Sequence, residues 1–272
     1  MTANDYKIIQ HFLSHSCGIV LSETKQYLVK NRLTKLLAKF ELDSFTELAS
    51  ILQTNSSIAL SIKAAVVDAM TTNETFWFRD DSQFITLKNT VLSEIFARKS
   101  GSIKIWSAAC SSGQEPYTIS MCVEDVIKQT KNKRNVQIIG TDISETILRE
   151  AKSAVYSDLA LSRGLDIQTR NRFFTKMHEG YQVNTDIKNR VRFQPFNLLK
   201  SFSVLGRFDI IFCRNVLIYF SDELKRDILS RMAASLDTGG YLFLSSTESM
   251  PVNIKEFETV RQGRVCYFKK IG

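Results

Sequence analysis

The spacing of apolar residues predicts that the N-terminal part of the chain is helical. Over residues 25–40, apolar side chains recur at the intervals that place them on one face of an α-helix. Shorter runs over residues 45–52 and 61–70 continue this pattern. We therefore expect an all-helical N-terminal domain over residues 1–75.

The rest of the chain alternates short apolar, β-rich runs with helical segments. The strand-like runs cover residues 103–109, 136–142, 208–215 and 240–246, and helical runs cover residues 116–130, 145–155 and 222–236. This alternation predicts a mostly parallel sheet covered by helices on both faces, which is an α/β fold. We expect this domain to span residues 98–272 and to close with a strand over residues 264–270.

Two stretches stand outside this alternation. Residues 160–195 contain the runs Phe173–Phe174, YQVN and VRFQPF, which alternate like short antiparallel strands and predict a small β insertion. Residues 76–97 lie between the two patterns, and we assign them to a linker between the domains.

Composition and charge narrow the class of protein. The chain of 272 residues has a formal net charge of +8, which suits nucleic acid, anionic lipid or an acidic protein surface without choosing among them. No apolar run approaches the roughly 18 residues that a membrane span needs, and the N-terminus lacks the features of a secretory signal. The five cysteines form no CxxC pair, which is typical of reduced thiols and leads us to expect a cytoplasmic protein.

The strongest local excess of positive charge lies over residues 25–40, which hold five basic residues and no acidic one. A solvated face of a packed helix explains a charged stripe more often than a binding surface does. Four of these basic residues share one face, beside the apolar one: Lys25, Arg32, Lys35 and Lys39.

Three loops that follow predicted strands carry candidate chemistry. In open α/β sheets, ligands bind beyond the carboxyl ends of the strands. The loop SAACSSGQEPYT over residues 107–118 is built of small residues that allow a ligand close approach, but it lacks the three glycines of a dinucleotide fingerprint. Asp142 follows the second strand, where it suits either a ribose contact or a helix N-cap. Arg214, Asn215 and Tyr219 follow a later strand, so together the loops indicate a nucleoside cofactor other than NAD.

Other candidate sites are weaker. His11 and His15 have helical spacing but lack the glutamate of the HExxH zinc motif, so no metal is expected. Cys213, at a strand end, suits a buried core thiol better than a nucleophile for cytosine methylation. The DPPY or NPPY tetrad expected for methylation of base amino groups is absent.

Six motifs occur in an order and spacing that resemble a known family. They are TTNETFWFRD (71–80), IWSAACSSGQEPYTISM (105–121), IIGTDIS (138–144), FNLL (196–199), FDIIFCRNVLIYF (208–220) and YLFLSSTES (241–249). Together they resemble the chemotaxis receptor methyltransferase family, CheR, whose small α-helical domain also resembles residues 1–75. The resemblance covers nearly the whole chain.

The resemblance implies a fold, a reaction and partners. The fold is a Rossmann-like S-adenosylmethionine-dependent methyltransferase domain with a small antiparallel β insertion, preceded by a small all-α domain. The reaction moves a methyl group from S-adenosylmethionine to glutamate side chains, with S-adenosylhomocysteine as the product. The partners are the cytoplasmic domains of methyl-accepting chemotaxis receptors, with no nucleic acid and no membrane insertion expected.

The resemblance also implies roles for individual residues. Arg79 and Tyr219 are expected nearest the methyl group and the accepting carboxylate. Because receptor methylation segments are rich in glutamate, the basic stripe of residues 25–39 becomes a candidate receptor-binding surface. The residues expected to contact the cofactor are Asn73, Thr75, Arg79, Glu115, Asp142, Asn197, Leu198, Arg214 and Asn215.

Two features depart from the family pattern. The loop after the first strand usually carries two consecutive glutamates, but Gln114 replaces the first here, which leaves Glu115 as the carrier of the role. Members that grip a receptor C-terminal tether carry extra glycine-containing residues in the β insertion, whereas residues 173–193 hold only Gly180. The resemblance therefore leaves tether binding open.

Two other functions remain as alternatives. The basic charge also suits an RNA methyltransferase, which salt-sensitive binding of transfer RNA would reveal. The second alternative is a methyltransferase-like adaptor, which binds receptors or cofactor without turnover. Such an adaptor would show no methyl transfer.

Overall fold

The computed structural model describes all 272 residues and divides into two compact units. The first unit contains Met1–Thr72 and Tyr219–Leu224, and the second contains Asn73–Ile218 and Lys225–Gly272. None of the helices combines the length and the apolar character that crossing a membrane requires.

The first unit is all-helical, as the apolar spacing predicts. Thr2 and Asp5 form a reciprocal capping box at the start of the first helix, and Gly18 ends that helix in the left-handed conformation. Ser44 and Ser56 cap two later helices through their hydroxyls. Its elements are α1 (Ala3–Cys17), η1 (Glu23–Lys25), α2 (Gln26–Lys39), α3 (Phe45–Leu52) and α4 (Ser57–Met70).

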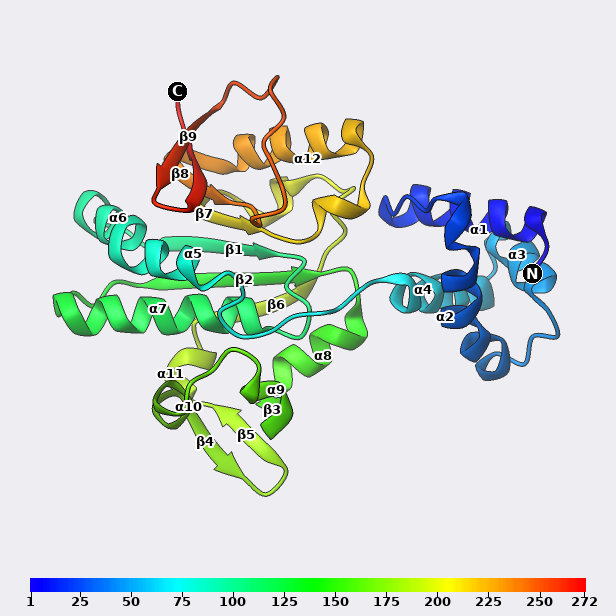
Figure 1. The fold of residues 1–272 in the computed structure, drawn as a ribbon, viewed down its shortest axis with the longest axis horizontal. Helices are drawn as coiled ribbons and strands as arrows, with labels where there is room; N and C mark the ends of the chain where they lie inside the picture. Colours follow the sequence, from blue (N-terminus) through cyan, green and yellow to red (C-terminus); the bar gives the residue numbers. More distant parts are fainter. The chain divides into compact units, whose positions relative to one another are not determined.

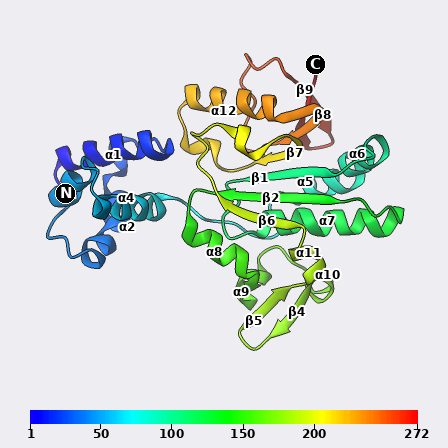
Figure 2. The ribbon, with the colours of Figure 1, turned by 180° about the vertical axis from the view of Figure 1, so that it is seen from behind.

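The second unit is built on a seven-stranded sheet (Figures 1 and 2) with the order β6-β2-β1-β7-β8-β10-β9. The first five strands of this order are parallel, and β10 pairs in antiparallel register with both β8 and β9. This confirms the predicted α/β fold. The strands are β1 (Ile103–Ala108), β2 (Val136–Asp142), β6 (Val191–Pro195), β7 (Phe208–Cys213), β8 (Leu236–Phe243), β9 (Phe257–Gln262) and β10 (Val265–Lys270).

Helices pack on the sheet through a core of fully buried side chains. Ile105, Ile210 and Phe243 of the sheet belong to the same buried apolar cluster as Leu87 and Val123 of the helical segments. Burial of apolar side chains between helices and sheet is the main source of stability in an α/β fold. The helical and 3-10 segments that alternate with the strands of the main sheet include α5 (Asp81–Thr86), α6 (Leu92–Arg98), α7 (Gln114–Thr130), α8 (Glu145–Ser153), η3 (Phe202–Leu205), η4 (Leu217–Tyr219) and α12 (Asp222–Ser235).

The segment expected to be a linker over residues 76–97 is instead helical from Asp81 onward. A five-residue π-helical stretch, η2 (Leu87–Val91), joins α5 to α6. Phe84, Leu92 and Ile95 of this segment are buried in the sheet core. A π-turn breaks the 3.6-residue repeat, which explains why the apolar spacing did not reveal one continuous helical segment.

A second, three-stranded antiparallel sheet lies apart from the main one (Figure 1), with the order β3-β5-β4. The strand predicted over VRFQPF is not part of it, because β6 pairs with β2 in parallel register. β6 is an edge strand of the main sheet whose side chains alternate in exposure, so its pattern looks antiparallel. The elements of the insertion are β3 (Val155–Tyr156), α9 (Asp158–Ser162), α10 (Ile167–Phe173), β4 (Phe174–Met177), β5 (Gly180–Val183) and α11 (Thr185–Lys188).

Candidate active site

The strand order of the main sheet reverses between β1 and β7. The chain runs outward from β1 through β2 to β6 on one side, and from β7 through β8 on the other. Ligands of open α/β sheets bind at the carboxyl ends of the strands at such a reversal. Glu115 stands in the first turn of α7, directly after the loop that follows β1, and Arg214 follows β7; both were predicted from the sequence.

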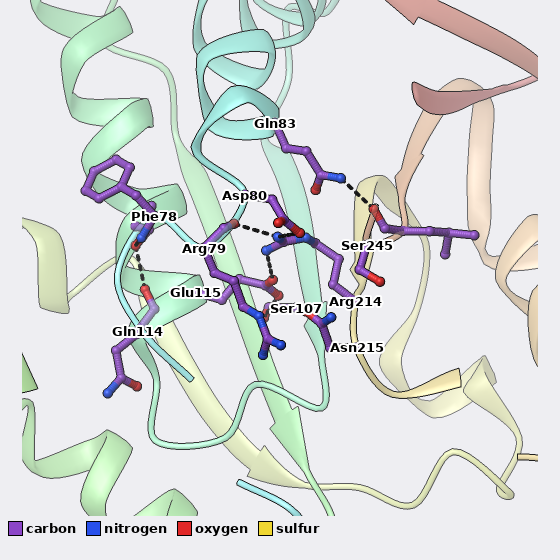
Figure 3. Close-up of polar contacts among 12 residues, drawn as sticks. Phe78, Arg79, Asp80, Gln83, Ser107, Gln114, Glu115, Arg214, Asn215 and Ser245 are labelled. Atoms are coloured by element: carbon purple, nitrogen blue, oxygen red, sulfur yellow. Dashed lines mark hydrogen bonds and ion pairs between the residues drawn. The ribbon is translucent and has the colours of Figure 1, made fainter. Parts of the chain in front are cut away.

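Arg214 is the centre of a buried ion-pair network at this edge (Figure 3). Its side chain is 2% exposed, and Nη1 donates to Oε2 of Glu115 at 2.8 Å. Nη2 donates to Oδ2 of Asp80 at 2.8 Å and to the carbonyl oxygen of Arg79 at 2.5 Å. The other carboxylate oxygen of Glu115 accepts a hydrogen bond from Oγ of Ser107 at 2.7 Å. The network therefore ties the segment before α5 to β1, to the first turn of α7 and to the loop after β7.

Asp142 anchors the loop after β1 rather than capping a helix. Its Oδ2 accepts a hydrogen bond from the amide of Ser111 at 2.9 Å, and its Oδ1 accepts one from the amide of Ser144 at 3.0 Å. The N-cap of α8 is Ser144, whose hydroxyl accepts from the amide of Ile147. The N-cap interpretation of Asp142 is therefore wrong.

The loop after β1 is held in an uncommon backbone conformation. Ala109 has φ 55°, Ser111 has φ 50° and Gly113 has φ 93°, all in the left-handed region. Non-glycine residues in this region cost free energy and are frequent at functional sites. Because Asp142 binds the amide of Ser111, its carboxylate stabilises the strained turn as well as facing the edge of the sheet.

The segment Asn73–Arg79 is fastened to the same edge. The carbonyl oxygen of Asn73 accepts from Oγ of Ser111 at 2.9 Å. The Arg79 guanidinium lies 5.4 Å from the centre of the Phe76 ring and donates to the carbonyl oxygen of Glu74 at 3.0 Å. The ring contact and the hydrogen bond restrict the mobility of this half-buried guanidinium.

The other predicted cofactor contacts lie at or near the same edge. Asn197 follows β6, and its Oδ1 accepts from the amide of Leu199 at 3.0 Å, while Leu198 is buried. The preceding Phe196 donates its amide to the carbonyl oxygen of Asp142 at 2.9 Å. Thr75 lies in the segment Asn73–Arg79 and is half-buried.

Two predicted residues have positions that the sequence did not suggest. Tyr219 ends η4 and belongs to the segment grouped with the first unit, whereas Arg79 belongs to the second unit. That they lie together at the methyl group stays a prediction.

Cys213 is buried in β7, and burial, with added repulsion from Glu248 and Glu115, raises the pKa of its thiol. A raised pKa disfavours the thiolate that a nucleophile requires.

The basic stripe, which begins at Lys25 at the end of η1 and continues along α2, is not uniform. Lys25, Lys35 and Lys39 are exposed. Arg32 is half-buried, and its Nη1 donates to the carbonyl oxygens of Met70 at 2.8 Å and of Thr71 at 3.0 Å. These contacts satisfy carbonyl groups at the end of α4, so Arg32 holds two helices of the first unit together.

Sequence reasoning missed three residues that the structure brings to the edge. Asp80 shares Arg214 with Glu115, and the amide of Ser111 binds Asp142. Glu248 accepts hydrogen bonds from the loop after β7. Asp80 and Glu248 stand inside the motifs TTNETFWFRD and YLFLSSTES, and that was the only signal that could have found them.

The residues at this edge fit S-adenosylmethionine, which carries a carboxylate, two positive centres and a ribose diol. Buried Nε of Arg214 has no hydrogen-bond partner and can donate to a carboxylate. Two carboxylates share the single guanidinium of Arg214, so the network has a net negative charge that favours a neighbouring cation. Asp142 follows β2 at this edge, and a carboxylate there can accept hydrogen bonds from ribose hydroxyls.

Comparisons with known proteins agree with this geometry. The family model described as CheR methyltransferase, SAM binding domain, matches residues 73–266, and the model of the CheR methyltransferase all-alpha domain matches residues 4–71. Chemotaxis protein methyltransferase 1 of Vibrio cholerae is 46% identical over 259 residues, which cover 94% of this chain and 93% of the relative. Chemotaxis protein methyltransferase 1 of Pseudomonas aeruginosa is 46% identical over 250 residues, covering 90% of each.

Among solved structures, a magnesium protoporphyrin IX methyltransferase from Synechocystis with bound S-adenosylmethionine is similar with a TM-score of 0.37 and 13% identity, covering 88% of this chain and 95% of that one.

Fold, site and family models together define a methyltransferase that uses S-adenosylmethionine as its cofactor. Both domain models match in their expected order, and two relatives share nearly half of their residues over almost their whole length. The chain therefore belongs to the CheR methyltransferase family, which confirms the resemblance and the cofactor predicted from its motifs.

Proposed function

We propose that this methyltransferase forms γ-glutamyl methyl esters on glutamate side chains in the cytoplasmic helices of chemotaxis receptors. The observation that carries the proposal is the 46% identity, over more than nine-tenths of the chain, to a protein named for chemotaxis methylation. The reaction adapts receptor signalling, because each ester removes one negative charge from a receptor helix.

The proposed reaction asks for positioning rather than for a general base. A glutamate of ordinary pKa, about 4.3, is already ionised at neutral pH. One carboxylate oxygen forms a bond to the methyl carbon while the carbon–sulfur bond breaks and its electron pair stays on sulfur, so no proton moves. Bound S-adenosylmethionine supplies the methyl group and the sulfonium leaving group. Alignment of the two reactants can contribute about 7 kcal/mol or more to the rate.

The proposed roles follow from the edge of the sheet. Asp142 holds the ribose, and Arg214 with Glu115 holds the charged end of the cofactor. Arg79 and Tyr219 lie beside the methyl group, where the guanidinium of Arg79 orients the accepting carboxylate. Holding that carboxylate too tightly in the ground state would oppose the reaction, which favours a half-exposed cation over a buried one. The remaining cofactor contacts are proposed for Asn73, Thr75, Asn197, Leu198 and Asn215.

The test is an assay with radiolabelled S-adenosylmethionine offered in parallel to receptor cytoplasmic fragments and to transfer RNA. We expect label only in the receptor fragment, released as methanol by mild alkali because a methyl ester hydrolyses. Alkali-stable label in RNA would favour RNA methylation instead. Binding of the receptor with no transfer of label would favour an adaptor.

We expect Asp142→Ala to weaken binding of S-adenosylhomocysteine by about 1–3 kcal/mol, the usual cost of removing a buried polar partner. Asp142 is 6% exposed and also anchors the amide of Ser111, so part of the loss comes from the loop. Isothermal titration calorimetry measures the affinity, and Asp186→Ala on the exposed side of α11 is the matched control. An unchanged affinity in a folded Asp142→Ala protein would rule out the ribose contact.

The basic stripe on α2 is proposed as the surface that meets the acidic receptor helix. Arg32 contributes to the fold of the first unit through the end of α4, so its substitution would mix stability with binding. Lys25, Lys35 and Lys39 are exposed and free of that complication. Exposed charges contribute about 0.2–1 kcal/mol each, so only their combined removal should be measurable.

We therefore expect the double substitution Lys35→Glu and Lys39→Glu to raise the KM for receptor by about threefold to tenfold at low salt, with cofactor affinity unchanged. Added salt should weaken the wild type in the same direction, because screening acts over about 8 Å at physiological strength. Steady-state kinetics with receptor fragments measures this effect.

The control for this prediction is the double substitution Lys131→Glu and Lys133→Glu, which changes the net charge equally on an exposed loop of the second unit. Equal effects of the two double substitutions would mean that net charge matters and the α2 stripe does not. A normal receptor KM in the α2 variant at low salt would leave the stripe as a solvated helix face.

A further inference from the structure

Glu248 accepts an unusual number of hydrogen bonds for one side chain. Its Oε1 accepts from the amides of Val216 at 3.0 Å and Leu217 at 2.9 Å. Its Oε2 accepts from the amide of Asn215 at 2.9 Å, and from both the amide at 3.0 Å and the hydroxyl at 2.7 Å of Ser245. Three consecutive backbone donors after β7 therefore share one carboxylate.

These contacts fix a loop whose shape is otherwise unfavourable. Asn215 has φ 58°, in the left-handed region that non-glycine residues seldom adopt. A carboxylate that binds three successive amides offsets the strain of this conformation, because charge-assisted hydrogen bonds are roughly twice as strong as neutral ones. The residue immediately before this turn is Arg214, the centre of the buried network.

Glu248 also links the loop to a rigid part of the second unit. It follows β8, where its own amide donates to the carbonyl oxygen of Ser245 at 3.1 Å. The preceding Leu244 accepts through its carbonyl oxygen from Nε2 of Gln83 at 2.7 Å, a contact drawn in Figure 3. Through these hydrogen bonds the loop after β7 is connected to the segment after β8, which in turn contacts α5.

We propose that Glu248 is a positioning residue for cofactor binding, which acts by holding the backbone of Asn215, Val216 and Leu217 so that Arg214 and Asn215 meet the cofactor. This inference rests on the proposed placement of the cofactor at Arg214 and Asn215. In this role Glu248 acts on affinity through the three amides that it binds, because its carboxylate oxygens are engaged by these donors.

Two substitutions of Glu248 distinguish the loss of an acceptor oxygen from a change in side-chain length. In Glu248→Gln, one oxygen becomes an NH₂ group that faces at least two backbone N–H donors, because each oxygen accepts from two or more groups. Glu248→Asp keeps both acceptor oxygens and shortens the reach by one methylene. The control is Glu258→Gln on the exposed side of β9, which makes the same chemical change away from the site.

The experiment measures affinity for S-adenosylhomocysteine by calorimetry, turnover with receptor fragment, and amide hydrogen exchange. We expect Glu248→Gln to weaken cofactor affinity about 10- to 100-fold, the cost of several charge-assisted hydrogen bonds. Glu248→Asp should recover part of it, and the KM for receptor should stay unchanged in both. Exchange should accelerate at residues 215–217 and stay slow in β1.

The results that overturn the proposal are equally specific. Wild-type cofactor affinity in Glu248→Gln, with or without faster exchange at residues 215–217, removes the positioning role. Faster exchange throughout β1 shows a general loss of stability and also overturns it. Failure of the proposed receptor methylation would appear separately, as a wild-type protein that binds S-adenosylhomocysteine and transfers no label to receptor.

Discussion

Replacing Arg214 by methionine is expected to destabilise the second unit by about 3–5 kcal/mol, because it leaves two partly buried carboxylates without their shared cation. Arg214 is 2% exposed, Glu115 is 14% exposed and Asp80 is 30% exposed at the side chain. Repulsion between the two carboxylates then acts where solvent screens it poorly. Urea unfolding followed by circular dichroism measures the loss.

Lys128→Met is the control for this prediction. Lys128 pairs with Glu124 at 3.4 Å on α7, but it is 59% exposed, so its removal should cost less than about 1 kcal/mol. An Arg214→Met protein that unfolds at the wild-type urea concentration would show that Arg214 does not hold a buried network.

Arg214→Lys tests whether the shape of the group matters beyond its charge. One ammonium lacks the planar fork with which Arg214 reaches Glu115, Asp80 and a carbonyl oxygen together. We expect an intermediate loss of stability. We also expect S-adenosylhomocysteine affinity to fall by at least about tenfold, because lysine has no counterpart of the unpaired Nε that is proposed to donate to the cofactor carboxylate, and charge-assisted hydrogen bonds are strong. Calorimetry at a temperature where the variant is folded separates binding from stability.

Most helices and strands could be predicted from the spacing of apolar residues, because buried positions recur with the period of the helix or the strand. Strands β1, β2 and β7 are buried over most of their length and are therefore rich in apolar residues on both faces. β9 was not predicted, since FETVRQ has only its first residue buried. β6 was assigned to the wrong sheet, because an edge strand with alternating exposure looks the same whether its neighbour is parallel or antiparallel.

Individual site residues could be predicted where a polar residue directly follows a predicted strand. The contacts between them could not, because their partners lie in distant segments of the chain. Glu115 and Arg214 were predicted one by one, but their direct ion pair joins residues 99 positions apart. The roles of Asp80 and Glu248 depend on the fold in the same way, since their partners lie after β7. The role of Arg32 was also hidden, because the stripe on α2 gives no sign that one member reaches the end of α4.

The close approach of the insertion to the segment Asn73–Arg79 depends on one glycine. Gly164 has φ 98°, and a Cβ atom placed on it would lie 1.9 Å from the carbonyl oxygen of Trp77. The amide of Trp77 donates to the carbonyl oxygen of Arg163 at 3.1 Å, so two backbones are in direct contact. Trp77 is fully buried among the aromatic side chains of the insertion, including Tyr156 and Phe174.

We expect Gly164→Ala to destabilise the protein by about 2–5 kcal/mol, since the added methyl meets rigid backbone and the positive φ adds strain. The displaced Trp77 carries Phe76 and Arg79 with it, so affinity for S-adenosylhomocysteine should fall together with stability. Gly263→Ala is the matched control, because Gly263 also has a positive φ, 60°, but nothing lies within 4 Å of its Cβ position. That control should cost only about 1–2 kcal/mol and spare the cofactor. Equal losses in urea unfolding for the two variants would mean that backbone strain explains both, and that the contact between the insertion and the Trp77 segment contributes nothing to the site.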